Sequence, residues 1–145
     1  MPRRLNEQVV AKQAVAVSAG GAAGAAIVAT KVDATGFSRA RFIFNIGNPA
    51  GTGSLQTGLG VYAAATSGAT FTLITGASAA AVTSGVLSGG ANNIIVIDVP
   101  VSSASPWLQA SGSFLNVTPA HGGVVELYSS VNRPPTQAEQ QVVVV

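Results

Sequence analysis

The sequence contains no cysteine, and only 8% of its 145 residues are charged. The missing thiols exclude disulfide bonds, thiolate catalysis and cysteine-ligated metal sites, and they leave the redox compartment undetermined. The charged share is about a third of the usual level, which gives a surface little electrostatic protection against self-association. We therefore expect much of the exterior to be covered by partners or by copies of the chain.

Basic residues are also few. Seven basic and five acidic residues give a formal net charge of +2, and Arg3 and Arg4 are the only adjacent basic pair. A nucleic-acid groove needs several basic residues on one face to displace counterions from the phosphates. We therefore expect no nucleic-acid partner.

Long apolar runs are missing as well. The Ala- and Gly-rich segment 14–29 is weakly hydrophobic and shorter than the roughly 20 strongly apolar residues that a membrane span needs. Glu7 and Lys12 lie between this segment and the basic start of the chain, whereas a signal peptide places its apolar region directly after the basic residues. We expect neither a membrane segment nor a secretion signal.

Reactive side chains are too scattered to indicate catalysis. The single histidine, His121, lies in a Pro-Ala-His-Gly-Gly turn, and no acidic residue stands at a recognisable spacing from it. A general base needs an orienting partner and a metal needs about three or four ligands. Asp33 fits a turn residue, and the Gly-rich segments lack the Lys and the following helix of a phosphate loop. The sequence therefore predicts no catalytic, cofactor-binding or metal site, and no enzyme.

The clearest strand pattern lies between residues 31 and 47. After an Asp-Ala-Thr-Gly turn, polar and apolar residues alternate from Arg39 onward, which is the period of a strand with one buried face. Arg39 and Arg41 would share the polar face and meet Asp98 or Glu126 on a neighbouring strand, or the acidic surface of a partner. The side chains expected to face the core are Phe42, Phe44 and Ile46.

Short segments with strand character recur along the chain between Gly, Ser and Pro turns. The β-branched run 93–100 is the most distinctive, and we expect it to be buried on both faces and ended by Pro100. Because no long periodic helix is present, the sequence predicts an all-β fold, an antiparallel β-sandwich or jelly-roll-like barrel of about eight short strands. Between residues 76 and 93 a weak strand or short helix is expected. The remaining strand segments are 14–17, 25–29, 57–64, 70–74, 107–110, 114–118 and 124–128.

Two arms flank the predicted sandwich domain, 14–135. Residues 1–13 are polar without a clear period, which indicates a flexible arm or one helical turn. Residues 136–145 form a C-terminal tail whose last four residues are all valine. Such an apolar end, with nothing following it to pack against, is suited to pair as an edge strand with a neighbouring sheet.

The alternating strand, a late Phe-Leu-Asn-Val-Thr-Pro segment (114–119) and a Pro-Pro tail together resemble small head proteins of tailed bacteriophages. In particular, the chain is similar to the decoration, or cement, proteins that bind the outside of the capsid. The resemblance implies a homotrimer that bridges neighbouring copies of the major capsid protein, made in the host cytoplasm and located on the virion. It implies no catalytic residue, cofactor, membrane or small-molecule substrate.

Assembly contacts are expected from the arms, the arginine pair and the only tryptophan, which could alternatively be a core residue. Another β-rich virion component, such as a tail-tube, head-completion or spike subunit, fits the same pattern. A secreted binding or adhesin module is a second alternative, and it would need an exposed aromatic platform. The predicted contact residues are Arg3, Arg4, Arg39, Arg41, Trp107, Val142, Val143, Val144 and Val145.

Overall fold

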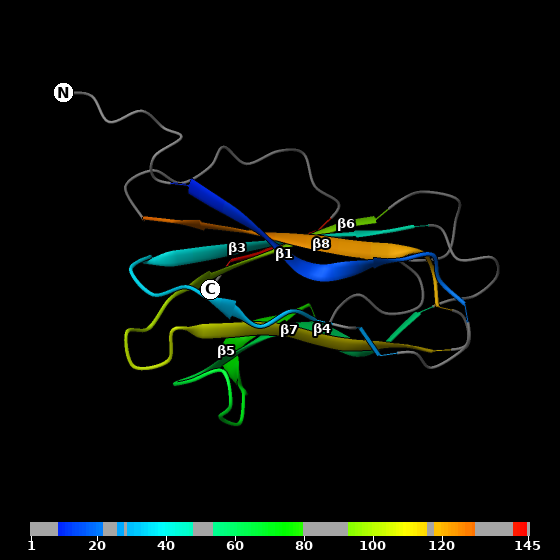
Figure 1. Cartoon of the computed structure of the whole chain (residues 1–145). Coiled ribbons are helices and arrows are strands. Elements are labelled where there is room, and N and C mark those ends of the chain that lie inside the picture. Colours follow the sequence, from blue (N-terminus) through cyan, green and yellow to red (C-terminus); the bar gives the residue numbers. More distant parts are fainter. Residues whose placement is uncertain are drawn as a thin grey trace.

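The computed structural model describes residues 9–21, 26–27, 29–47, 54–79, 93–115, 118–129 and 141–144, with the backbone alone for 54–58, 79, 93, 115 and 141–144. The described residues form nine strands and no helix, arranged as two layers (Figure 1). Predictions for Arg3, Arg4 and Val145 and for residues 80–92 lie outside the described residues. The strands are β1 (Val9–Ser18), β2 (Val32–Asp33), β3 (Arg39–Ile46), β4 (Ser54–Ala64), β5 (Thr72–Ala79), β6 (Asn93–Pro100), β7 (Trp107–Leu115), β8 (His121–Tyr128) and β9 (Gln141–Val144).

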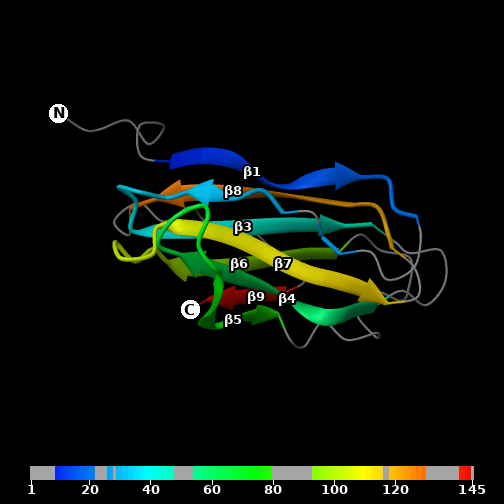
Figure 2. The ribbon, with the colours of Figure 1, turned by 60° about the horizontal axis from the view of Figure 1, so that its bottom comes forward.

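One layer is a five-stranded sheet with the order β1-β8-β3-β6-β9, and the other is a four-stranded sheet with the order β2-β7-β4-β5. Figure 2 shows the strands of the larger sheet side by side from β1 to β9. All pairings between these strands are antiparallel except that of β6 with β9, which is parallel. The predicted all-β fold, an antiparallel β-sandwich, is confirmed.

The core is built against β3, the middle strand of the larger sheet. Phe42, Phe44 and Ile46 are between 0% and 2% exposed, as the alternation predicts. The two phenylalanine rings stack with centroids 6.1 Å apart. Burying each ring contributes about 2–3 kcal/mol relative to leaving it in water. The four-stranded sheet covers these side chains with its own buried residues, Leu59, Val61, Leu108, Ala110 and Phe114.

A glycine opposite β3 makes room for one of these rings. Gly123 of β8 pairs with Phe44. A Cβ atom at Gly123 would lie 2.9 Å from Cδ1 of Phe44 and 3.2 Å from the carbonyl oxygen of Ile43. Only a residue without a side chain therefore allows the ring to lie this close to β8.

The sandwich extends beyond both predicted boundaries, at residues 14 and 135. β1 begins at Val9, which pairs with Tyr128, so residues 9–13 are strand and not arm. These residues lie at a sheet edge and are exposed or half-buried, so they lack the buried face that produces a readable period. At the other end, β9 belongs to the five-stranded sheet of its own chain.

One continuous strand, β7, replaces the two strands predicted at 107–110 and 114–118. The predicted Ser-Gly-Ser turn between them is part of the strand. Gly112 is buried there, and a Cβ atom on it would lie 3.3 Å from both Cα of Leu59 and Cδ1 of Ile27. This glycine therefore serves close packing of β7 and β4, and the turn prediction is wrong.

Two lysines form hydrogen bonds to backbone carbonyl groups far away in the sequence. Lys12 of β1 donates a hydrogen bond from Nζ to the carbonyl oxygen of Asp33 in β2, at 2.9 Å. Lys31 donates one to the carbonyl oxygen of Ser67, at 2.7 Å, and its Nζ lies 5.5 Å from the centroid of Phe71. The first bond joins the edge strands of the two sheets, and a lysine at an edge also discourages pairing with other chains.

Candidate functional site

The candidate site is the surface of the five-stranded sheet that faces away from the four-stranded sheet, which we call the outer face. On β3 it carries the residues that alternate with the core positions, and register places alternate residues of β8 and β6 beside them. The outer face has a charged half and an apolar half. In the charged half the aligned residues are Arg39, Arg41, Asp98, Pro100, Glu126 and Tyr128. In the apolar half they are Ile43, Asn45, Ile94, Val96, Gly122 and Val124.

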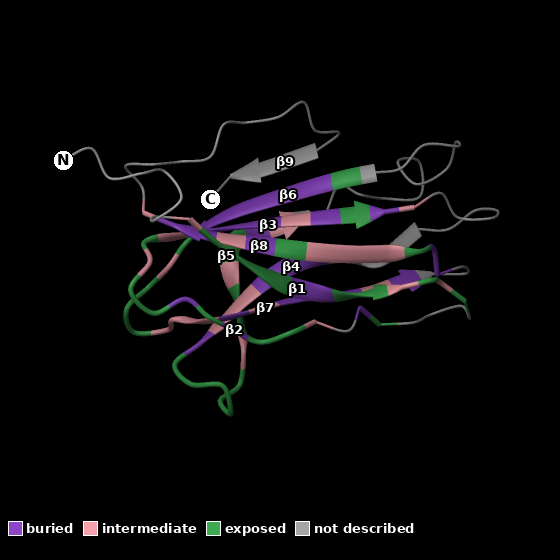
Figure 3. Cartoon of the chain, turned by 45° about the horizontal axis from the view of Figure 1, so that its top comes forward, coloured by how far each residue is buried: buried purple, intermediate pink, exposed green. Residues whose placement is uncertain are grey.

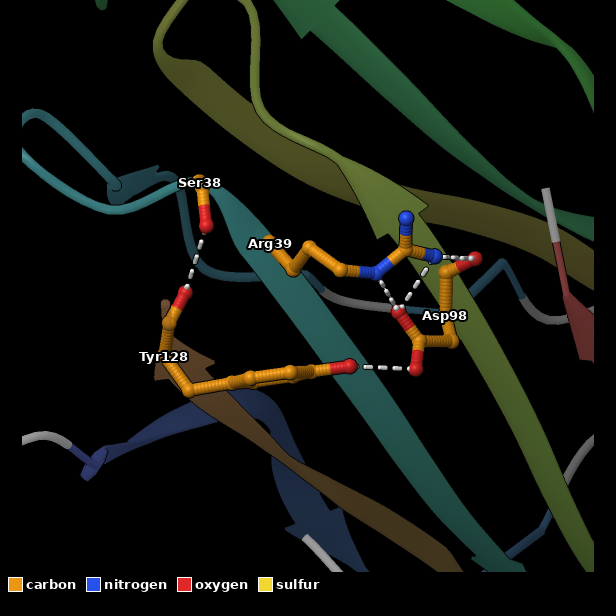
Figure 4. A network of polar contacts seen from close by, with 4 residues as sticks. All are labelled: Ser38, Arg39, Asp98 and Tyr128. Carbon is orange, nitrogen blue, oxygen red and sulfur yellow. Dashed lines mark hydrogen bonds and ion pairs between the residues drawn. The ribbon is translucent and has the colours of Figure 1, made fainter. Parts of the chain in front are cut away.

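A shared carboxylate organises the charged half (Figure 4). Nε and Nη2 of Arg39 lie 2.9 Å and 2.8 Å from Oδ1 of Asp98. The hydroxyl of Tyr128 donates to the other carboxylate oxygen, Oδ2, at 2.5 Å. Asp98 is only 1% exposed, so its charge is compensated by groups of β3 and β8. The network therefore joins three neighbouring strands, β8, β3 and β6.

The network raises the pKa of both hydrogen-bond donors, Tyr128 and Arg39. Burial raises the pKa of Tyr128, and the hydrogen bond that its hydroxyl donates to Asp98 raises it further. For Arg39, burial lowers the pKa, but hydrogen bonds with Tyr128 and Asp98 together with the nearby charge of Asp98 raise it overall. Both groups therefore keep their protons through the neutral range, and the arrangement suits structural pairing more than proton transfer.

Arg41 lies in register between Asp98 and Glu126, the two acids that the sequence predicted as its neighbours. It is only 5% exposed, so it offers little surface to a partner. Arg39 exposes 22% of its side chain and remains accessible at the edge of the network. In Glu126, Oε2 is enclosed and has no hydrogen-bond partner among the described residues.

The apolar half contains a groove of about 690 Å³ that lies over β1, β8 and β3. Val17 and Val124 line it and are 85% and 45% exposed. Gly122 leaves space in the groove, because a Cβ atom there would lie 3.3 Å from Cγ2 of Val17. The remaining lining residues are Ala11, Lys12, Gln13, Val15, Ser18, Ile43, Asn45, Gly47, Ala120, His121 and Gly123.

Exposed apolar side chains concentrate on this half of the sheet. Of the five large hydrophobic residues exposed in the described part of the chain, Val17, Ile94 and Val124 belong to it. Ile43 is aligned directly with Val124, and Ile94 with the next outward residue, Asn45. We call these exposed side chains, Val17, Ile94 and Val124, the apolar strip. The sequence analysis did not predict it, although apolar residues at outward positions of β3 and β8 depart from the usual pattern in which the outer face of an antiparallel sheet is polar.

The other predicted contacts lie elsewhere. Trp107 is half-buried and outside the core, and on the four-stranded sheet it pairs with Ala64 and Asp33. Tyr62, on a neighbouring strand, is also half-buried. Val142, Val143 and Val144 lie in β9, in register with Val96, Ile97 and Asp98. The structure therefore does not bring the arginines, the tryptophan and the valines into one site.

His121, the single histidine, is held by a local contact. Its Nδ1 donates to the carbonyl oxygen of Pro119 at 2.9 Å, and its ring lies 4.9 Å from that of Phe114. The described residues include no group of three or more His, Asp or Glu residues positioned to hold a metal ion. In the same residues there is no helix with the length and apolarity needed to cross a membrane.

The outer face thus has an apolar half with exposed side chains, beside a charged half in which Arg41, Asp98 and Tyr128 are buried. No protein-family model matches the chain, and no curated protein sequence or solved structure matches it.

Proposed function

We propose that the protein is a structural virion protein that binds the outer surface of a bacteriophage capsid and stabilises the head by bridging neighbouring capsid subunits. Its partner is the major capsid protein, and its own state is a homotrimer. The observation that supports this proposal most is the apolar strip on the outer face, where Val17, Val124 and Ile94 are 85%, 45% and 39% exposed.

The composition of the strip fits a protein interface. Interface cores are depleted in charge, and among the residues that line the groove only Lys12 is formally charged at neutral pH. In the charged half beside it, Arg39 and Asp98 already form an ion pair with each other. Each copy would contribute a modest contact, and repetition over a shell multiplies its effect.

The main alternative is another β-rich virion component, such as a tail-tube, head-completion or spike subunit. Such a component would use the same apolar half of the outer face, but it would bind another part of the virion. Binding to purified tails in place of capsids would favour it.

A secreted binding or adhesin module is a second alternative, supported by one observation. Trp107 and Tyr62 are both half-buried on the four-stranded sheet and outside its core, and partly exposed aromatic rings are suited to stacking on flat ligands. Glycan binding that is lost in Trp107→Ala, without capsid binding, would favour this reading.

Capsid binding tests the main proposal directly. Purified protein added to bare capsids should bind and raise their melting temperature. Val124→Asp should weaken binding at least about tenfold, because it places a charge in the centre of the apolar strip. The matched control is Leu73→Asp, since Leu73 is similarly exposed, at 41%, but lies on the four-stranded sheet. Absence of binding at saturating concentration, or equal loss in both variants, would remove the proposal.

A further inference from the structure

We infer that β9 is an exchangeable strand: in the assembled protein, the edge of β6 pairs with β9 of a neighbouring copy in place of its own. This inference rests on the proposed function, because assembly on a shell supplies the high local concentration that exchange requires. The occupant of the edge is therefore a second copy of the chain.

The edge of β6 needs a partner strand. Five consecutive residues, Ile95 to Val99, are buried at 0–1%, so β6 has the character of an inner strand (Figure 3). Without β9, β6 would become the edge strand of this sheet. An open edge of this composition pairs readily with other chains.

The present partner of β6 is a short strand. β9 consists of four residues, Gln141–Val144, and runs parallel to β6, whereas the other pairings between strands are antiparallel. It lies beside β6 at the edge of the sheet (Figure 2). Pairing of β6 with β9 from another chain would form the same register and the same backbone hydrogen bonds, so exchange costs little in contact energy.

The connection is long enough to reach another copy. Eleven residues, 130–140, separate Ser129 from Gln141. Fully extended, this connection spans about 40 Å. The register sets the distance within one chain: three strand spacings across the sheet and about six residues along it, roughly 25 Å in all. About 15 Å of reach is therefore spare.

Concentration decides between the two pairings. A connection of eleven residues corresponds to an effective concentration of β9 in the millimolar range at its own β6. In dilute solution, β6 therefore pairs with β9 of its own chain. Copies held side by side on a surface reach a comparable local concentration, and exchange between them becomes competitive.

A cysteine-trapping experiment tests exchange in the free protein, because the chain has no cysteine of its own. Val96 and Val142 are directly opposite in register, at a strand spacing that a disulfide can bridge. When Val96→Cys and Val142→Cys chains are mixed and briefly oxidised, exchange places the two thiols opposite each other and a disulfide joins the two variants. The matched control mixes Val142→Cys with Val124→Cys, which places the thiol on an exposed valine of β8.

We expect few mixed dimers at micromolar concentration and a large fraction at about 1 mM, well above the control. The double variant Val96→Cys/Val142→Cys should cross-link within one chain when dilute. Mixed dimers no more frequent than in the control at 1 mM would overturn the inference. Ile97→Cys with Val143→Cys repeats the test at the next register position, so a folding defect in one variant does not decide the result.

The two proposals fail separately. Mixed dimers without any capsid binding would leave exchange standing and remove the proposed function. Capsid binding without mixed dimers above the control would do the reverse.

Discussion

At the scale of single residues, the most consequential group is the carboxylate of Asp98. It is 1% exposed and accepts hydrogen bonds from Arg39 and from Tyr128. A buried charge without partners is strongly destabilising, so these donors are what permit a charge within β6. The sequence named Asp98 as one of two candidate neighbours of the arginines, and the structure confirms an ion pair with Arg39.

Tyr128→Phe should lower the free energy of unfolding by about 1–3 kcal/mol, because the buried carboxylate of Asp98 loses the hydrogen bond from this hydroxyl. The same change should also alter how the free energy of unfolding falls at alkaline pH. The pKa of Tyr128 is raised above its ordinary value of 10.0, so the folded state holds the proton more tightly than the unfolded state. The stability that the protonated Tyr128 hydroxyl contributes is complete below about pH 10, and it is lost as the pH rises through the folded-state pKa.

Urea unfolding at several values between pH 7 and pH 11 measures both effects. The wild type should lose stability above pH 10 more steeply than Tyr128→Phe. Tyr62→Phe is the matched control, since Tyr62 is half-buried on the other sheet. Parallel curves for the wild type and Tyr128→Phe would show that the hydroxyl does not titrate with folding.

At the scale of elements, glycines decide how closely strands approach. Gly112 and Gly123 lie within strands, where glycine normally weakens pairing. Each stands where a Cβ atom would lie at 3.3 Å or less from a neighbour. Their effect is packing between chain segments, which local sequence rules interpret as turns.

Gly112→Val should destabilise the protein by about 1–3 kcal/mol, because the added atoms press against the backbone of Leu59 in β4. Gly112→Ala should cost less. The control is Gly68→Ala, where a Cβ atom meets nothing within 4 Å. The midpoint of urea unfolding, at an unchanged slope, measures the difference. Equal midpoints for Gly112→Val and Gly68→Ala would contradict close packing at this position.

At the scale of the whole molecule, the two sheets present unlike surfaces. The outer face of the five-stranded sheet carries the apolar groove and a neutralised charge network, whereas Trp107 and Tyr62 lie on the four-stranded sheet. With 8% charged residues overall, association through the groove would depend mainly on apolar burial. Such association responds weakly to ionic strength.

If the protein binds capsids as proposed, its capsid affinity should therefore change less than about twofold between 50 mM and 500 mM salt. Binding measured by co-sedimentation over this range provides the test, with Val124→Lys as a variant whose binding is expected to be weak throughout. A steep loss of affinity with salt would instead place the contact on charged groups such as Arg39.

The sequence by itself determined the all-β class, the inward face of β3 and the burial of β6 on both faces. These features follow from alternation and β-branched composition, which are local properties of each segment. Only the tertiary structure decided that Asp98 pairs with Arg39, that Val17 and Val124 share one groove with Ile43, and that β9 lies against β6 of its own chain. Strand order and register bring together residues far apart in the sequence, and no local pattern records which strands become neighbours.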